Sequence, residues 1–265
     1  MTGHGLSRGV LRPDAAAGFL DVRKQPPAPA LAGLVDFYWN PRWDLRGRDP
    51  YEQKVLAHPN VHLVFEPEGA LVYGVQRGVF VRQLAGAGQV FGVKFRPGAF
   101  RPFAHGPVAA LADRTVPAAG VFGAAVAEVG RRILALDDLA AMAALADGFL
   151  LGLLPALPAD PQVAEVAALV ETITASPRLF RVDELARGLG MPVRRLQRLF
   201  AEYVGASPKW VLRRARLHEA AARADEGAGL DWAALAADLG YADQAHLTRD
   251  FTAAVGSPPS RYAGR

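Results

Sequence analysis

The sequence predicts an α+β protein with a β-rich N-terminal part and an all-helical C-terminal part. Short apolar stretches bounded by glycine or proline occupy residues 55–103, a pattern typical of the strands of a β-barrel or β-sandwich. Residues 121–154 are rich in alanine and leucine and lack strand signals, which favours one or two helices. After a proline-rich segment at residues 154–161, the pattern is helical to the end of the chain.

Four segments of the β-rich part predict strands. NVHLVFEP alternates apolar side chains, and ALVYGV, GVFVRQL and QVFGVKF follow it, each closed by a glycine or proline. Residues 1–54 show no such pattern and are expected to be irregular, with a turn or linker at QPPAPA, residues 25–30. The sequence therefore predicts a barrel-like or sandwich-like domain with helices over residues 1–158.

The boundary between the two parts is expected in LPALPADP, which has three prolines in eight residues. Prolines at this density interrupt both helices and strands and are typical of linkers. We therefore place the second domain at residues 159–265.

An internal repeat dominates this second domain. DELARGLGMPVRRLQRLFAEYVGASP, from Asp183, aligns with AALAADLGYADQAHLTRDFTAAVGSPP, from Ala233. Both copies run from a short leucine-containing helix through a glycine turn to a longer helix, then to glycine and Ser-Pro. Each copy predicts a helix-turn-helix unit, over residues 183–204 and 233–255. SPKWVLRRARLHEAAARA predicts a long connecting helix with Ser207 as its N-cap.

The second helix of the first copy has two chemically different faces. Its inner face is apolar at the spacing i, i+3, i+4, with Leu196, Leu199 and Phe200. Its outer face carries Arg194, Gln197 and Arg198. Between Arg187 and Arg216 there are eight basic residues and one acidic residue, Glu202. This local patch indicates an anionic partner more strongly than the net charge of +4 does.

These segments resemble the DNA-binding domain of the AraC/XylS transcription regulators. DELARGLGMPVRRLQRLF, RRARLHEAA and GYADQAHLTRDFTAAVGSPPSRY carry the resemblance. It implies a sequence-specific regulator of transcription that binds the major groove of double-stranded DNA. It also implies base contacts from the outward residues of both recognition helices, namely Arg194, Gln197, Arg198, Gln244, His246, Thr248 and Arg249. GQVFGVKFRPGAFRPF resembles a motif of an uncharacterised β-rich domain that precedes such DNA-binding domains.

The expected partners follow from these assignments. Arg213 and Arg214, on the connecting helix, are expected to contact phosphates. A small effector is expected in the N-terminal domain, near Arg96, Trp39, Trp43 and His62. RNA polymerase and a second copy of the chain are further expected partners. No cofactor, metal or catalytic residue is assigned.

A metal-dependent enzyme is the main alternative. His58, His62 and Glu66 have even spacing and would share one face of an extended strand, as metal ligands in a cupin-like barrel would. Arg96 and Arg101 have an alternative role in salt bridges with Glu66, Glu68 or Asp113. A further alternative is a sensor whose helical domain has become a degenerate interaction module, against which the basic patch argues.

The composition argues against secreted, cysteine-dependent and membrane-spanning proteins. The chain has no cysteine, which excludes disulfides and cysteine nucleophiles and fits a cytoplasmic location. The first twenty residues lack the pattern of a signal peptide. The apolar stretch Leu139–Leu157 includes Asp147 and Pro155, so a buried or dimer-forming helix is favoured over a membrane span.

Overall fold

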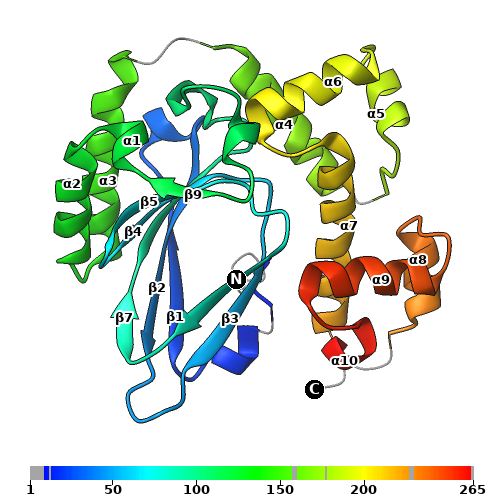
Figure 1. Cartoon of the computed structure of the whole chain (residues 1–265), viewed down its shortest axis with the longest axis horizontal. Coiled ribbons are helices and arrows are strands. Elements are labelled where there is room, and N and C mark those ends of the chain that lie inside the picture. Colours follow the sequence, from blue (N-terminus) through cyan, green and yellow to red (C-terminus); the bar gives the residue numbers. More distant parts are fainter. Residues whose placement is uncertain (1–8, 12, 157–159, 177, 227–229, 264–265) are drawn as a thin grey trace.

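The computed structural model describes residues 9–11, 13–156, 160–176, 178–226 and 230–263 (Figure 1). Two antiparallel sheets form the β-rich part. The larger has the order β1-β2-β8-β4-β5-β9, with β7 also paired to β2, and the smaller is the pair β3-β6. The strands are β1 Leu20–Gln25, β2 Val35–Asp44, β3 Tyr51–Leu56, β4 His62–Glu66, β5 Gly69–Tyr73, β6 Val79–Leu84, β7 Ala87–Gln89, β8 Phe91–Phe95 and β9 Thr115–Pro117.

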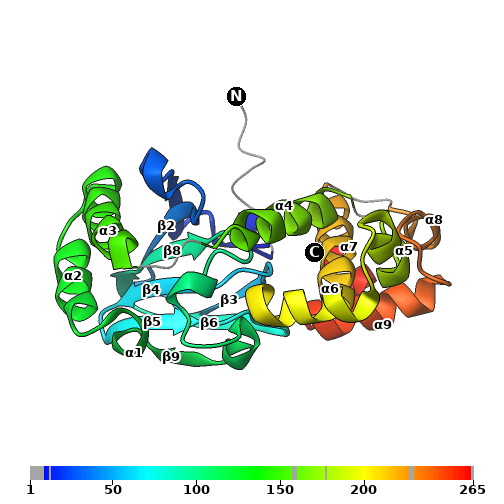
Figure 2. The ribbon, with the colours of Figure 1, turned by 90° about the horizontal axis from the view of Figure 1, so that it is seen from above.

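Helices lie on both sides of these sheets. Figure 2 shows α2 and α3 on one side of the β-rich part and the C-terminal helices on the other. The N-terminal helices are α1 Ala119–Phe122, α2 Ala125–Leu134 and α3 Leu139–Leu153, with the short helices η1 Pro13–Ala16, η2 Pro29–Leu31, η3 Arg101–Phe103, η4 Val108–Leu111 and η5 Leu154–Ala156. The C-terminal helices are α4 Gln162–Ala175, α5 Val182–Gly188, α6 Val193–Leu199, η6 Phe200–Val204, α7 Pro208–Asp225, α8 Trp232–Asp238, α9 Gln244–Val255 and α10 Pro259–Ala263.

The predicted α+β class and the four predicted strands are confirmed, whereas the prediction that residues 1–54 are irregular is wrong. β1, β2 and most of β3 lie there. Pro41 breaks the strand pattern of β2 because it lacks an N–H donor, yet its carbonyl accepts the backbone N–H of Val90 at 3.3 Å. The pairing of β2 with β8 sets Tyr38 opposite Val93, a partner too distant in sequence for local patterns to reveal.

The predicted helix-turn-helix repeat is confirmed element by element. α5 and α6 match α8 and α9, and the two connecting glycines both have positive φ, 62° at Gly190 and 68° at Gly240. α6 continues directly into η6, one turn of π-helix, and α9 runs through the corresponding twelve residues as α-helix. Ser207 is the N-cap of α7, as expected, and its Oγ accepts the Trp210 N–H at 3.2 Å.

The two parts of the chain share their hydrophobic cores. The first core joins β8, α3, α4, α6, η6 and the start of α7, and its last residue is Leu212. The second begins on α7 at Leu217 and joins α8 and α9 to Leu11 and to Leu56 of β3. Each helix-turn-helix unit therefore packs against the β-rich part. The predicted boundary between residues 158 and 159 lies outside the described residues and stays a prediction.

The turn at residues 96–101, within the FRPGAFRP motif, attaches the first unit. Arg96 pairs with Glu171 of α4, and the Nε of Arg101 donates to Glu202 of η6 at 2.6 Å. Between them, Gly98 has φ 82°, and a Cβ there would lie 2.8 Å from the Cγ1 of Val166 on α4. Glycine is thus required both by the backbone and by the approach of α4.

We expect Gly98→Ala to lower the free energy of unfolding by about 2–4 kcal/mol, from left-handed strain and overpacking together. Gly106→Ala is the matched control, because its Cβ would meet no atom within 4 Å and its φ is not positive. Urea unfolding of both variants measures the difference. Equal effects would show that Gly98 does not limit the packing of α4.

Candidate nucleic-acid interface and cavity

The outer face of α6 is open to solvent. Leu196 and Phe200 are fully buried and fix the helix onto the first core. The exposed side chains are Arg194, Arg195, Gln197 and Arg198. Three of these are the predicted base contacts, and Arg195 extends the same basic surface. The arrangement presents three guanidinium groups and an amide, the donors best suited to base edges and phosphates.

The outer face of α9 is less basic and partly covered. Gln244 and Arg249 are exposed, whereas His246 and Thr248 are half-buried. Asp243 caps the helix by accepting the N–H of His246 at 2.6 Å, and the His246 ring lies edge-on to Tyr241 with centroids 5.1 Å apart. These contacts leave Gln244 and Arg249 as the fully accessible predicted contacts of the second unit.

The two predicted phosphate contacts on α7 differ. The Arg213 Nε lies 2.8 Å from a carboxylate oxygen of Asp250 on α9, and the Arg213 side chain remains 39% exposed. Arg214 is only 3% exposed, stacks over Trp210 and donates to the carbonyl of Arg77 at 2.5 Å. Burial lowers the pKa of Arg214 to about 10, which leaves it charged at neutral pH. The expectation that Arg214 contacts phosphate is therefore withdrawn, because its guanidinium attaches α7 to the loop before β6.

Two recognition helices at the ends of α7 define the candidate interface. α6 and α9 lie across opposite ends of this helix (Figure 1). α7 has 18 residues, or about 27 Å at 1.5 Å per residue. This length is comparable to the repeat of B-DNA, about 34 Å, so the scale suits two neighbouring major-groove segments.

A cavity of about 250 Å³ lies between the two sheets of the β-rich part. Trp39, Trp43 and His62, three of the four predicted effector contacts, line it together. The Trp39 Nε1–H donates to the Nδ1 of His62 at 3.2 Å. Arg96 does not line it, and its Nε donates to the carbonyl of Ala32 at 2.7 Å while its terminal nitrogen pairs with Glu171. Arg96 therefore does not contribute to this cavity, and it forms a salt bridge with Glu171 instead of with the expected Glu66, Glu68 or Asp113.

Sequence patterns missed much of the cavity wall. Lys24 on β1 and Lys94 on β8 both line it, and both ammonium groups lie over the ring of Phe37, at 4.3 and 4.7 Å. Lys94 also pairs with Asp36 at 2.9 Å. Burial, and then the charge of Lys94, lowers the pKa of Lys24. The rarity of lysine was the available signal, because these are two of only four in the chain.

The three side chains considered as a metal trio have separate partners. His62 bonds to Trp39, and Glu66 accepts from the Tyr73 hydroxyl at 2.7 Å and from Arg82 at 2.9 Å. His58 stacks on His218 with ring centroids 3.8 Å apart. No group of three or more His, Cys, Asp or Glu suited to a metal occurs within the described ranges.

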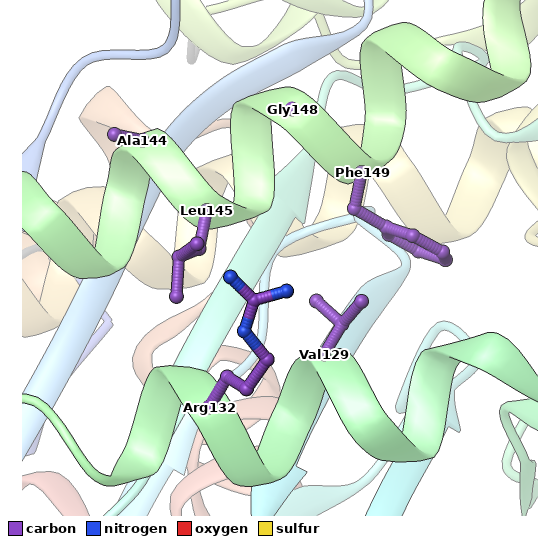
Figure 3. Close-up of a pocket in the computed structure, with 6 residues that line it drawn as sticks. All are labelled: Val129, Arg132, Ala144, Leu145, Gly148 and Phe149. Carbon is purple, nitrogen blue, oxygen red and sulfur yellow. The ribbon is translucent and has the colours of Figure 1, made fainter.

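A second hollow, of about 300 Å³, lies between α2 and α3 (Figure 3). Its walls are Val129 and Arg132 of α2 and Ala144, Leu145, Gly148 and Phe149 of α3. By length and composition alone, Leu139–Ala156 could cross a membrane, and 28% of it is buried. Asp147 attaches this helix to the β-rich part, since it accepts the Tyr38 hydroxyl at 2.6 Å and the Ala28 N–H at 3.0 Å.

Two family models match separate parts of the chain. A family described as a helix-turn-helix domain matches residues 185–265, and a domain of unknown function (DUF6597) matches residues 23–117. No curated protein matches. ToxT of Vibrio cholerae O395 is similar at 9% identity and a TM-score of 0.40, over 92% of this chain and 96% of that one. ToxT of V. cholerae strain SCE256, bound to an unsaturated fatty acid, is similar at 11% identity and a TM-score of 0.39, over 96% of this chain and 92% of that one.

The match to a helix-turn-helix family, with the repeated unit and the exposed basic helix α6, supports the class of DNA-binding regulators of transcription. The chain carries an AraC-type helix-turn-helix domain at its C-terminus, behind a β-rich domain of the DUF6597 family.

The cavity makes stability depend on pH. Burial, with smaller effects from Lys94 and His58, lowers the pKa of His62 to about 3. An unfolded histidine titrates near 6.5, so below that pH the unfolded chain binds a proton that the folded chain does not. The free energy of unfolding should therefore decrease as the pH decreases. For His62 we expect a loss of about 2 kcal/mol between pH 6.5 and pH 5. Urea unfolding of His62→Asn should lack this part of the loss. Exposed His105 is the control, and an unchanged slope in His62→Asn would contradict the assignment.

Proposed function

We propose that the protein is a sequence-specific transcription regulator whose α6 and α9 enter two successive major-groove segments of one DNA duplex. The observation that supports this proposal is the same design in both units. An apolar face is buried in a core and a polar face is left open, at opposite ends of one connecting helix. A recognition helix presents its side chains to base edges in this way.

The proposed contacts fall into two groups. Bases are contacted by Arg194, Gln197 and Arg198 in the first unit and by Gln244 and Arg249 in the second, with His246 and Thr248 at the half-buried edge. Arg213, whose guanidinium is partly neutralised by Asp250, contacts a phosphate. Arginine that meets guanine through O6 and N7 supplies the commonest specific contact, so Arg194 and Arg198 set the preference of the first half-site.

We expect Arg194→Ala to weaken binding to the best site by about 1–3 kcal/mol and to relax preference at one or two base pairs. Arg213→Ala should weaken binding to all duplexes alike and reduce the salt dependence, as loss of a phosphate contact does. Duplexes selected from a random pool, with their single-base variants, provide the measurement. If Arg194→Ala weakens every duplex equally, Arg194 contacts a phosphate. If the intact chain prefers no duplex, the proposed function is wrong.

For the cavity we propose an effector that is small and mainly apolar and carries an acidic group. Aromatic and aliphatic side chains supply most of the wall, which suits an apolar body. The ammonium groups of Lys24 and Lys94 both contact the ring of Phe37, and the charge of Lys94 helps to lower the pKa of Lys24. An anion there would offset the mutual repulsion of the two ammonium groups. The protein then acts by binding and without catalysis, in the cytoplasm.

The apolar anion 1-anilinonaphthalene-8-sulfonate is a suitable probe of this cavity. We expect the double variant Lys24→Met/Lys94→Met to bind it about tenfold more weakly, because charge-assisted contacts are lost. Lys54→Met is the matched control, since Lys54 lies on β3 outside the lining and pairs with Glu52 at 3.0 Å. Fluorescence titration measures all three proteins. Equal affinities would refute the acidic-group requirement.

Two expected partners stay predictions. For a second copy of the chain, we propose the hollow between α2 and α3, whose wall combines the partly buried Leu145 and Phe149 with the exposed small residues Ala144 and Gly148. α3 is apolar over most of its surface, with Asp147 as its one charged residue, and such a helix is normally covered. RNA polymerase is proposed as a partner because it is the enzyme that a transcription regulator controls.

A further inference from the structure

The strand β3 separates the cavity from the second helix-turn-helix unit. Gln53 and Val55 line the cavity. Leu56 is fully buried in the second core, together with residues of α7, α8 and α9. Successive side chains of a strand point to opposite faces, so one strand faces the cavity on one side and the DNA-binding helices on the other. β3 also packs directly against α9.

A histidine pair continues this contact at the end of the strand. The ring of His58 lines the cavity and stacks on His218 of α7, with centroids 3.8 Å apart and planes within 6° of parallel. His218 is also hydrogen-bonded to the backbone of Ala57, another residue of the lining. The cavity wall and the connecting helix thus meet without any intervening side chain.

The first unit contributes none of its described residues to the cavity lining. It is attached through the turn at residues 96–101, and that turn contributes no residue to the cavity lining. α7 divides in the same way. Arg214 attaches its first half to Arg77, Leu212 is its last residue in the first core, and Leu217 is its first in the second.

We propose that β3 and the His58–His218 stack couple occupancy of the cavity to the position of the second helix-turn-helix unit relative to the first. A molecule in the cavity displaces Val55, Ala57 or His58, and the displacement reaches α7 beyond Leu212 and then α9. The first unit remains attached through Glu171 and Glu202. The regulated quantity is therefore the placement of α9 relative to α6. This inference rests on the proposed function, because it assigns a regulatory role to the proposed effector cavity.

The test uses the full chain and 1-anilinonaphthalene-8-sulfonate, with amide hydrogen exchange as the readout. In the wild type, the bound probe should change exchange in α8 and α9 by about tenfold, and leave α5 and α6 unchanged. His218→Ala should bind the probe with unchanged affinity but lose the response in α9. His218→Phe, which retains a ring for stacking, should keep the response. His105→Ala, at an exposed histidine remote from the stack, is the control.

Two results would overturn the inference: exchange in α9 that ignores the bound probe, or a full response in His218→Ala. If the probe does not bind, Val64→Trp takes its place, because Val64 lines the cavity from β4. The indole, which is larger than the valine side chain, should then change amide hydrogen exchange in α9. Unchanged exchange in α9 would overturn the inference. Failure of the proposed function is measured separately: the intact chain would then prefer no selected duplex. The hydrogen-exchange result would still decide whether the cavity is coupled to α9.

Discussion

Burial of apolar surface between the β-rich part and the helices is the constraint on which the other features depend. Neither helix-turn-helix unit buries its inner face alone. The first completes a core with β8 and α4, and the second completes another with Leu56 and Leu11. Because hydrophobic burial scales with area and has no direction, polar contacts must fix the orientation. This orientation is fixed by the ion pairs of Arg96 and Arg101 and by the buried guanidinium of Arg214.

The features that depend on local periodicity could be predicted from the sequence. The repeat, its glycine turns, the N-cap Ser207 and the outer face of α6 follow from spacings of three and four residues, which a helix turns directly into faces. The cavity was foreseen in part, through Trp39, Trp43 and His62. Residues of a recognition helix are also easier to assign, because solvent exposure leaves their chemistry unaltered.

The predictions that differ from the structure concern residues whose contacts lie far away in the sequence. β1 and β2 look irregular because their pattern is broken by polar residues and Pro41, and their stability comes from partners elsewhere in the chain. Arg96 and Arg214 were expected at ligands because a sequence does not show which acceptors an arginine meets. In the structure each meets acceptors between 64 and 137 residues away. No local rule identifies such partners, since they are set by tertiary packing.

The tandem arrangement of the two units also determines the symmetry of the target. A dimer of single helix-turn-helix subunits has a two-fold axis, and its operator is palindromic for that reason. Here one chain supplies both recognition helices, in the same chain direction and with different outer residues, arginine-rich on α6 and mixed on α9. A single copy therefore has no internal dyad. On the proposed function, the site of a single copy has a polarity, with two unlike halves, and the bound protein faces one direction along the gene.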